Sequence, residues 1–205
     1  MGTTVEGRRD RKTRETRERI FREAIALFGQ KGFADTQIRD IAQRAGVSAV
    51  TVHNHFGTKD RILHDLAGLF FAQAMNLFEE LTRLAAETTD PGVLVAAARG
   101  TVRSWAVIGR QVIADTQRVV LRTATGDRLY RESRARLIPL MENLQRSGIV
   151  RSDLAAPVLA SMAADLILGA LTSWISDLSD TQSASEKAAE VVGFLVATLR
   201  AAPRA

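Results

Sequence analysis

Apolar residues recur three and four positions apart along most of the chain, which is the spacing of an amphipathic α-helix. The rhythm starts at Ile20, continues through Ala24 and Phe28, and stops near Gly32, a residue suited to end a helix. Period-two alternation, which would indicate half-buried strands, never persists. The pattern therefore predicts an all-α fold with about nine helices.

Capping residues set the predicted limits of the first helices. Thr36 is suited to cap a short second helix that ends at Gly46. Ser48 is suited to cap a third helix that runs to about residue 54, and Thr58 to cap a fourth. The later helices, the fourth included, are expected at residues 59–87, 91–108, 110–123, 127–147, 157–177 and 185–201.

Two residues are expected to interrupt the second half of this pattern. Gly126 is expected to break it just before the seventh helix. Pro139 lies inside that helix and lacks a backbone donor, so a kink is predicted there.

Positive charge is concentrated in the first third of the chain. Residues 1–64 hold 13 Lys or Arg against 8 Asp or Glu, whereas residues 65–205 hold 15 of each, so the net charge of +5 lies entirely in the N-terminal segment. A basic module on a neutral body is typical of a phosphate-binding protein, because Lys and Arg pair with phosphates and release counterions. The alternative is a solvated basic tail without a partner.

Composition excludes several classes of site. Cysteine is absent, so disulfides, thiolate zinc sites and cysteine nucleophiles are excluded, and a reducing cytoplasm is the expected compartment. His53, His55 and His64 lack the spacing and the carboxylate neighbours of a metal site, so no metal and no cofactor is expected. The N-terminus is polar, and Asp165 interrupts the longest apolar run, residues 154–175. We therefore expect a soluble protein with neither signal peptide nor membrane span.

Residues 37–54 have the pattern of a helix-turn-helix: a short helix, a tight turn at Gly46, and a second helix that opens with small and polar residues. Glycine suits the turn because other residues are strained at positive φ. In such a unit the first residues of the second helix, here 48–51, enter the major groove, where Ala49 or Val50 can contact a thymine methyl. Any helical hairpin shares the glycine turn, so the geometry alone leaves a hairpin without DNA open.

A longer run of residues narrows these alternatives. It consists of Arg19-Ile20, Glu23-Ala24, Leu27-Phe28, Gly32-Phe33, Thr36, Ile41-Ala42, Ala45-Gly46-Val47-Ser48, Thr51-Val52, His55-Phe56 and Lys59-Asp60. In order and spacing these residues resemble the N-terminal signature of the tetracycline-repressor (TetR) family. The resemblance covers only the first third of the chain. Together with the charge distribution it implies a basic arm at residues 1–17, a DNA-binding domain at 18–64 and a ligand-binding and dimerisation domain at 65–205.

The resemblance implies roles for individual residues of the DNA-binding domain. Arg39 sits where family members often present a side chain to a base, although a surface ion pair with Asp35 or Asp40 is the alternative. Thr51 matches a threonine that contacts phosphate or base, and Lys59 matches a lysine whose charge faces a phosphate beside a helix N-terminus. The DNA-binding residues expected on this basis are Arg39, Ser48, Ala49, Val50, Thr51, His53, Asn54, His55 and Lys59.

Two of these positions depart from the family pattern. His53 stands where a tyrosine usually contacts a phosphate, and Val50 stands where a small residue such as glycine is common. An imidazole donates one hydrogen bond when neutral and carries a charge when protonated, so we expect tighter operator binding at about pH 6 than at about pH 8. Val50 therefore leaves the sequence of the operator open, whereas DNA binding itself is still expected.

For the body, the resemblance implies a small-molecule pocket among the middle helices. The expected ligand-binding residues are Phe71, Met75, Phe78, Trp105, Ile108, Val112, Asp115, Thr116, Val119, Met141, Met162, Asp165 and Leu166. Most are apolar, and methionine adapts to varied ligand shapes, but an ordinary core has the same composition. Asp165 lies in an apolar helix and needs a partner, for which Arg118, Arg122 or a basic group on a ligand is available.

The resemblance also implies dimerisation through the last two helices. The expected interface is one stripe of each helix: Leu159, Ala163, Ile167, Ala170 and Trp174 on the eighth, and Val191, Val192, Leu195 and Leu199 on the ninth. Two such pairs related by a twofold axis would form a four-helix interface. A buried core helix has the same pattern.

These inferences together predict a ligand-responsive transcriptional regulator, acting as a repressor. It would bind a palindromic operator in double-stranded DNA as a homodimer and be released by a small, largely apolar effector. Two alternatives stay open: a DNA-binding activator or architectural protein without an effector, and an all-α enzyme that uses the apolar pocket. No glycine-rich phosphate loop, Ser-His-Asp set or paired-carboxylate motif favours the enzyme, so no catalytic residue is expected.

Overall fold

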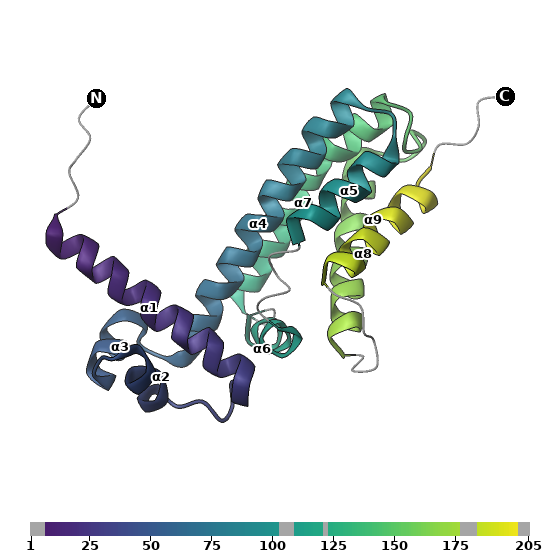
Figure 1. The fold of residues 1–205 in the computed structure, drawn as a ribbon. Coiled ribbons are helices and arrows are strands. Elements are labelled where there is room, and N and C mark those ends of the chain that lie inside the picture. The colour runs from purple at the N-terminus through teal and green to yellow at the C-terminus, as the bar shows by residue number, and fades with distance from the viewer. Residues whose placement is uncertain (1–6, 103–108, 121–122, 177–183, 201–205) are drawn as a thin grey trace.

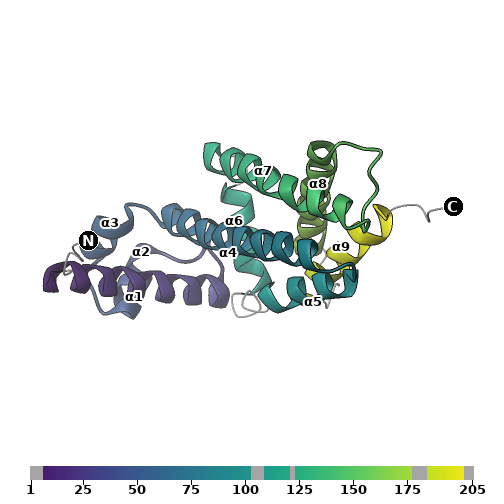
Figure 2. The same ribbon diagram turned by 90° about the horizontal axis from the view of Figure 1, so that it is seen from above.

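The computed structural model describes residues 7–102, 109–120, 123–176 and 184–200, and within these ranges the chain forms nine α-helices and no β-strand (Figure 1). They are α1 (Arg8–Lys31), α2 (Ile38–Ala45), α3 (Ala49–Phe56), α4 (Lys59–Glu87), α5 (Pro91–Val102), α6 (Arg110–Val120), α7 (Ala124–Arg146), α8 (Ala156–Ser176) and α9 (Ala184–Thr198). We call α1–α3 the head and α5–α9 the body. The long α4 runs from one into the other (Figures 1 and 2). The all-α fold expected from the sequence is confirmed.

The head packs around one apolar cluster. From α1 it takes Ile20, Ala24 and Phe28, which are four residues apart and fully buried. Its other members are Ile41, Ala42, Ala45, Val52, Phe56, Ile62, Leu63, Leu66 and Val112. Burying an aliphatic or aromatic side chain of this kind stabilises the fold by about 1.5–3 kcal/mol. Only the second half of α1 takes part, so its first turns, which include most of the predicted arm, extend past the head (Figure 1).

The turn between α2 and α3 has the predicted chemistry. Gly46 has a φ of +64°, in the left-handed region that a side chain disfavours. The next residue, Val47, donates its N–H to the Ala42 carbonyl at 3.0 Å. Ser48 caps α3, because its Oγ accepts from the N–H of Thr51 at 3.0 Å. Local signals alone therefore fix the angle at which α3 leaves α2.

The start of α2 differs from the prediction that Thr36 caps it. The capping residue is Gln37, whose N–H donates to the carboxylate of Asp40 at 2.9 Å. Thr36 is fully buried, and its hydroxyl donates to the Gly32 carbonyl at 2.7 Å. Thr36 thus closes the turn between α1 and α2, and α2 is capped one residue later than predicted.

In the body, α7 packs against both α4 and α8, while α9 packs mainly against α5. The last turn of α9 is joined to the loop after α7, because the N–H of Arg151 donates to the Leu199 carbonyl at 2.8 Å. The buried body core consists of Leu77, Phe78, Leu81, Ala85, Leu94, Ala98, Ile113, Leu137, Leu140, Met141, Leu144, Ile149, Val150, Ala156, Leu159, Ala160, Ala163, Ala164, Trp174, Ile175 and Leu199.

Most predicted helix limits agree with the structure to within a few residues. Gly126, expected to break the pattern, lies in the first turn of α7, because Thr123 caps this helix and its Oγ accepts from the N–H of Gly126. The same helix continues through Pro139, which is exposed. The described part of α5 ends at Val102, and the rest of that predicted helix, residues 103–108, lies outside the described residues.

The two apolar cores meet at α4 and α6, so the predicted domain limit at residue 64 is not a sharp structural division. Leu66 of α4 and Val112 of α6 both belong to the head cluster. Ile113, the neighbour of Val112, belongs to the body core instead. A single helix therefore contributes side chains to both cores.

By length and composition, α8 is the helix in the described part of the chain that could cross a membrane, with a mean hydropathy of 1.7 over its most apolar stretch. In the structure α8 packs against α6, α7 and α9. Leu159, Ala160 and Ala163 are buried in these contacts. In all, 33% of that apolar stretch is buried inside the structure, whereas the sequence led us to expect a buried helix.

Candidate functional site

One face of α3 closes the head core and the other is open to solvent. Val52 and Phe56, four residues apart, are buried. The exposed residues of the helix are Ala49, Val50, His53 and Asn54. Val50 is 67% exposed, although its side chain is apolar. The head therefore presents a short helix whose outer face carries small, apolar and hydrogen-bonding groups.

The first turn of this helix is held rigid by Ser48 and Thr51. Besides the capping bond, their hydroxyl oxygens lie 2.8 Å apart, within hydrogen-bonding distance. Thr51 is half-buried. The N–H groups of the first turn carry the positive end of the helix dipole, so a rigid first turn keeps an anion-attracting end in a fixed place.

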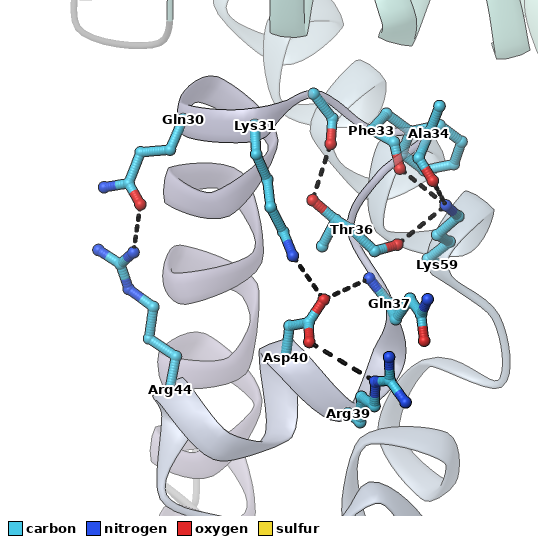
Figure 3. Close-up of polar contacts among 11 residues, drawn as sticks. Gln30, Lys31, Phe33, Ala34, Thr36, Gln37, Arg39, Asp40, Arg44 and Lys59 are labelled. Atoms are coloured by element: carbon cyan, nitrogen blue, oxygen red, sulfur yellow. Dashed lines mark hydrogen bonds and ion pairs between the residues drawn. The ribbon is translucent and has the colours of Figure 1, made fainter.

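Lys59 fixes the loop between α1 and α2 to the start of α4. Its Nζ donates to three carbonyls, those of Phe33 (2.7 Å), Thr36 (3.0 Å) and Ala34 (3.1 Å) (Figure 3). The ammonium also lies 4.4 Å from the centre of the Phe33 ring. Because a lysine ammonium has three hydrogens, these bonds use all of them. The sequence led us to expect that the Lys59 ammonium contacts a phosphate. In the structure it is instead hydrogen-bonded to backbone carbonyls within the head.

Asp40 organises the outer surface of α2 (Figure 3). Its Oδ2 accepts from Lys31 Nζ at 2.6 Å and from the N–H of Gln37 at 2.9 Å. These hydrogen bonds, the one from Lys31 above all, lower the pKa of Asp40 below its usual 3.8. Arg39 lies 3.9 Å from the other carboxylate oxygen and is 77% exposed. Its ion pair is long, so the guanidinium can extend away from the head.

Arg17 joins three helices, a role that the sequence pattern did not indicate. Its guanidinium donates to the backbone carbonyl of His55 in α3 and to the carboxylate of Asp65 in α4. It also lies 4.2 Å from the centre of the Phe56 ring. Asp65 in turn is 3.3 Å from Arg61. Arg17 is one of many arginines in a charged segment, so only its place in the fold distinguishes it.

The body contains a cavity of about 170 Å³ between α4, α5, α7, α8 and α9. Its lining includes two polar residues, Gln73 and Lys187. The apolar lining residues are Ala74, Leu77, Phe78, Leu81, Leu94, Ala98, Leu137, Leu140, Met141, Leu144, Ala163, Ile167, Leu171, Trp174, Ala188, Val191, Val192, Leu195 and Val196. An apolar cavity of about 150 Å³ in a protein stays dry and binds benzene. The body therefore has room for a small apolar molecule.

Of the residues expected to bind a ligand, Phe78 and Met141 line this cavity. The structure places Phe71, Met75, Val112, Asp115, Thr116, Val119, Met162, Asp165 and Leu166 outside its lining. Trp105 and Ile108 lie outside the described residues. The pattern of apolar positions on α4 and α7 could have suggested Leu77, Leu137 and Leu140, but a helical stripe does not distinguish a packed core from a lined void.

The two polar α6 residues in that set are satisfied within their own helix. Asp115 is 5% exposed and pairs with Arg118 at 2.8 Å. The hydroxyl of Thr116 donates to the Val112 carbonyl at 2.7 Å. These contacts hold both side chains against α6, and neither residue lines the cavity.

The partner of Asp165 also differs from the expectation. The hydroxyl of Tyr130 donates to its carboxylate, and this hydrogen bond raises the pKa of Tyr130. Arg118 pairs with Asp115 instead, and Arg122 lies outside the described residues. Asp165 is exposed on the outer side of α8.

The stripes expected to form a dimer interface point into the interior of a single chain. Ala163, Ile167, Trp174, Val191, Val192 and Leu195 line the cavity, Leu159 and Leu199 belong to the body core, and Ala170 is half-buried. The expectation is wrong for Leu159, Ala163 and Trp174, which are at most 4% exposed and leave no surface for a second copy. Both sides of α8 are apolar, so the spacing of its apolar residues does not show which side faces the interior.

Helix α6 contacts the cavity wall as well as the head. The guanidinium of Arg110 lies 4.5 Å from the centre of the Trp174 ring, which lines the cavity. Gln117 Nε2 donates to the hydroxyl of Thr172, also on α8, at 2.7 Å. On the other side of α6, Val112 is buried in the head cluster. Helix α6 thus contacts both the α8 wall of the cavity and the head core.

Residues 20–66 match the family described as "Bacterial regulatory proteins, tetR family". Among curated proteins, the chain is 34% identical over 67 residues to the uncharacterized HTH-type transcriptional regulator YerO of Bacillus subtilis, covering 33% of this chain and 23% of that protein. The matched segments span about a quarter of the length of the curated relatives. Sequence similarity thus covers the head and the first turns of α4.

The whole fold resembles solved structures of low sequence identity. One is Thermus thermophilus FadR, described as a TetR-family transcriptional repressor in complex with lauroyl-CoA, with a TM-score of 0.59 and 24% identity over 92% of this chain and 98% of that one. Another is SmeT, the repressor of a multidrug efflux pump of Stenotrophomonas maltophilia, in complex with triclosan. Its TM-score is 0.60, with 20% identity over 90% of this chain and 91% of that one. These likenesses extend the shared fold to the body.

Proposed function

We propose that this chain, which belongs to the TetR family of bacterial regulatory proteins, is a transcriptional repressor that binds operator DNA as a homodimer and is released by a small, largely apolar molecule. The observation that carries the proposal is the open outer face of α3, a helix whose other face is fully committed to the head core. The major groove is wide enough to admit one α-helix. A match to a family of regulators also argues against the enzyme alternative.

Within α3, we assign base reading to the residues at its exposed start. Ala49 and Val50 present methyl groups that fit thymine methyls, and Asn54 offers a donor and an acceptor. Arg39, Ser48, Thr51 and His53 flank this surface and are assigned to base or phosphate contacts. The net charge of +5 in residues 1–64 supports binding to a phosphate backbone.

Lys59 and His55 act indirectly in this proposal. Lys59 holds the start of α4 against the α1–α2 loop, so that the N–H groups of the first turn of α4, not the ammonium, face a phosphate. His55 contributes its backbone carbonyl to the Arg17 contact, which fixes the far end of α3.

The internal cavity is the proposed effector site. It is almost wholly apolar, which suits a largely apolar ligand. Two structures of similar fold, FadR with lauroyl-CoA and SmeT with triclosan, hold ligands with large apolar parts. We infer that a ligand shifts the wall formed by α8 and α9, and that α6 transmits this shift from Trp174 through Arg110 to the head. A coupling of about 1–3 kcal/mol would release DNA about 5- to 150-fold.

The outer side of α8 and α9 is the proposed dimer interface. Val158, Met162 and Phe194 are large apolar side chains that are 48–56% exposed on these two helices. A second copy would cover them, and two heads would then reach successive major grooves about 34 Å apart on a palindromic site. This assignment uses the face of α8 opposite to the stripe predicted from the sequence.

The proposal is tested by gel shift of the full chain on the DNA immediately upstream of its own gene, read together with a variant that fills the cavity. We expect wild type and Ala163→Leu to bind this DNA alike, because the cavity leaves room for the larger side chain. Benzene, which fits an apolar cavity of about this size, should release DNA from wild type but not from Ala163→Leu. Absence of specific DNA binding would overturn the proposal, and a promoter that this chain switches on in a reporter would favour the activator alternative.

A further inference from the structure

Most of the positive charge of the head lies on the exposed start of α1. All residues of 8–15, which we call the helical arm, are exposed, and the first α1 residue in the head core is Ile20. The net charge of residues 1–64 is +5. The helical arm accounts for +3 of it, because it carries five cations against two carboxylates, namely Arg8, Arg9, Arg11, Lys12 and Arg14 against Asp10 and Glu15.

The fold does not account for these cations. Arg8 and Lys12 are four residues apart in one helix, and like charges at this spacing destabilise a helix. Arg11 lies 3.8 Å from Glu15, but both side chains are more than 60% exposed, and such pairs add little to stability. Within the described ranges, Arg8, Arg9 and Lys12 have no carboxylate at ion-pair distance. The charge of the helical arm is therefore available to an anion outside the chain.

The helical arm leaves the head beside the end of α3. The guanidinium of Arg17, two residues after the arm, donates to the carbonyl of His55 and lies 4.2 Å from the ring centre of Phe56, both in the last turn of α3. In both views the arm extends past α3 on the side of the head away from the body (Figures 1 and 2). At about 1.5 Å per residue, it reaches about 13 Å from Arg17. A major groove that holds α3 is about 12 Å wide and is bordered by phosphates, so the arm is long enough to span the distance from α3 to a bordering strand.

The helical form of the arm limits what it can bind. An α-helix with its side chains is about 10–12 Å across, whereas the minor groove of B-DNA is about 6 Å wide. The arm is therefore too thick to enter a minor groove, as an extended basic tail can. We propose that the helical arm lies on the outside of the duplex and binds backbone phosphates beside the major groove that receives α3. The inference rests on the proposed function, since it places a further element of the head on the same DNA.

The test is the salt dependence of binding, measured by fluorescence anisotropy with the full chain on the DNA upstream of its own gene. The arm variant combines Arg8→Ala, Arg9→Ala and Lys12→Ala, and alanine keeps the arm helical. Each phosphate contact steepens the slope of log affinity against log salt concentration by about 0.9, and a dimer has two arms. The slope of the arm variant should therefore be less steep than that of wild type by about 2 or more. Changes that preserve charge, Arg8→Lys with Arg9→Lys and Lys12→Arg, should keep the wild-type slope.

A matched control removes three exposed cations from the body, through Arg99→Ala, Arg136→Ala and Arg151→Ala, and should also keep the wild-type slope. An unchanged slope in the arm variant overturns the inference, because the arm is then a solvated segment. An equal reduction in the control overturns it too, since the cations then act only through net charge. Loss of the arm's contribution when A·T pairs beside the site are replaced by G·C pairs would indicate entry into a minor groove, and would also overturn it.

A duplex of random sequence and equal length keeps this inference separate from the proposed function. Preference for the upstream DNA, with an unchanged slope in the arm variant, refutes the role of the arm alone. Equal affinity for both duplexes, with a slope that the arm variant reduces, refutes operator binding alone. Equal affinity with an unchanged slope refutes both.

Discussion

The guanidinium of Arg17 contacts the carboxylate of Asp65, which ties the N-terminal helix to α4 beside the end of α3. The same guanidinium also donates to the backbone carbonyl of His55, near the end of α3. The orientation of α3 on the head therefore depends on a contact between residues 48 positions apart.

Arg17→Ala is expected to weaken operator binding more than Arg22→Ala does. Both changes remove one cation from α1, but Arg22 is 71% exposed and pairs with the neighbouring Glu23, whereas Arg17 joins three helices. We expect a loss of about 1–2 kcal/mol in binding, allowing for the partial exposure of the pair. Gel shift of both variants measures the difference, and equal losses would mean that Arg17 acts only through its charge.

Val50→Ala and Val52→Ala are a matched pair on one helix. Val50 is 67% exposed, so its truncation should change the free energy of unfolding by less than about 0.5 kcal/mol, while operator affinity falls by up to about tenfold. Val52 is fully buried, so its truncation should destabilise the fold by about 2 kcal/mol. Denaturant melts and gel shifts separate the two effects. Destabilisation by Val50→Ala would show that its side chain is packed in the free protein.

Asp40 makes the stability of the head depend on acid pH. Its pKa is lowered in the fold, chiefly by the hydrogen bond from Lys31, so its contribution is fully present above the usual carboxyl value of 3.8 and is lost as the pH falls through the lowered value. Asp40→Asn should therefore melt at a lower temperature than wild type at neutral pH, and the two melting temperatures should converge in strong acid. Asp35→Asn, at an exposed neighbouring position, is the control. A difference that stays constant with pH would exclude a role for the carboxylate charge.

The proposed dimer is tested by placing charge on the outer side of α8 and α9. Met162→Glu combined with Phe194→Glu should weaken self-association at least about tenfold in sedimentation equilibrium, because like charges would meet across a twofold interface. Leu69→Glu adds a carboxylate at an apolar site that is 52% exposed on α4 and should leave association unchanged. If the double variant associates like wild type, the interface lies elsewhere.

The parts of the fold that depend on neighbouring residues were predictable from the sequence. Ser48 and Thr58 cap helices where expected, and α4 has the predicted limits. The contacts of Lys59 and Arg17 were not predictable, because their partners are more than 20 residues away and no spacing marks them.

Helix α8 shows a different limit. Ala163 and Met162 are adjacent and both suit an apolar surface, yet one lines the cavity and the other faces solvent. The spacing of apolar residues shows that such a helix has two apolar sides. Which side is buried depends on α7 and α9, which pack against it. Three α8 residues predicted for the dimer interface, Ala163, Ile167 and Trp174, therefore line the cavity, and Met162, predicted to bind the ligand, is exposed.

The burial of Val112 in the head cluster limits how this protein can be recombined with its relatives. A chimaera that takes residues 1–64 and joins them to another body would leave a gap where α6 packs against α1 and α4, and would unfold more easily than either parent. A transplant that also carries α6 together with the first half of α4 would keep the gap filled. The transferable unit of DNA recognition is thus discontinuous in the chain, and a cut after the helix-turn-helix divides it.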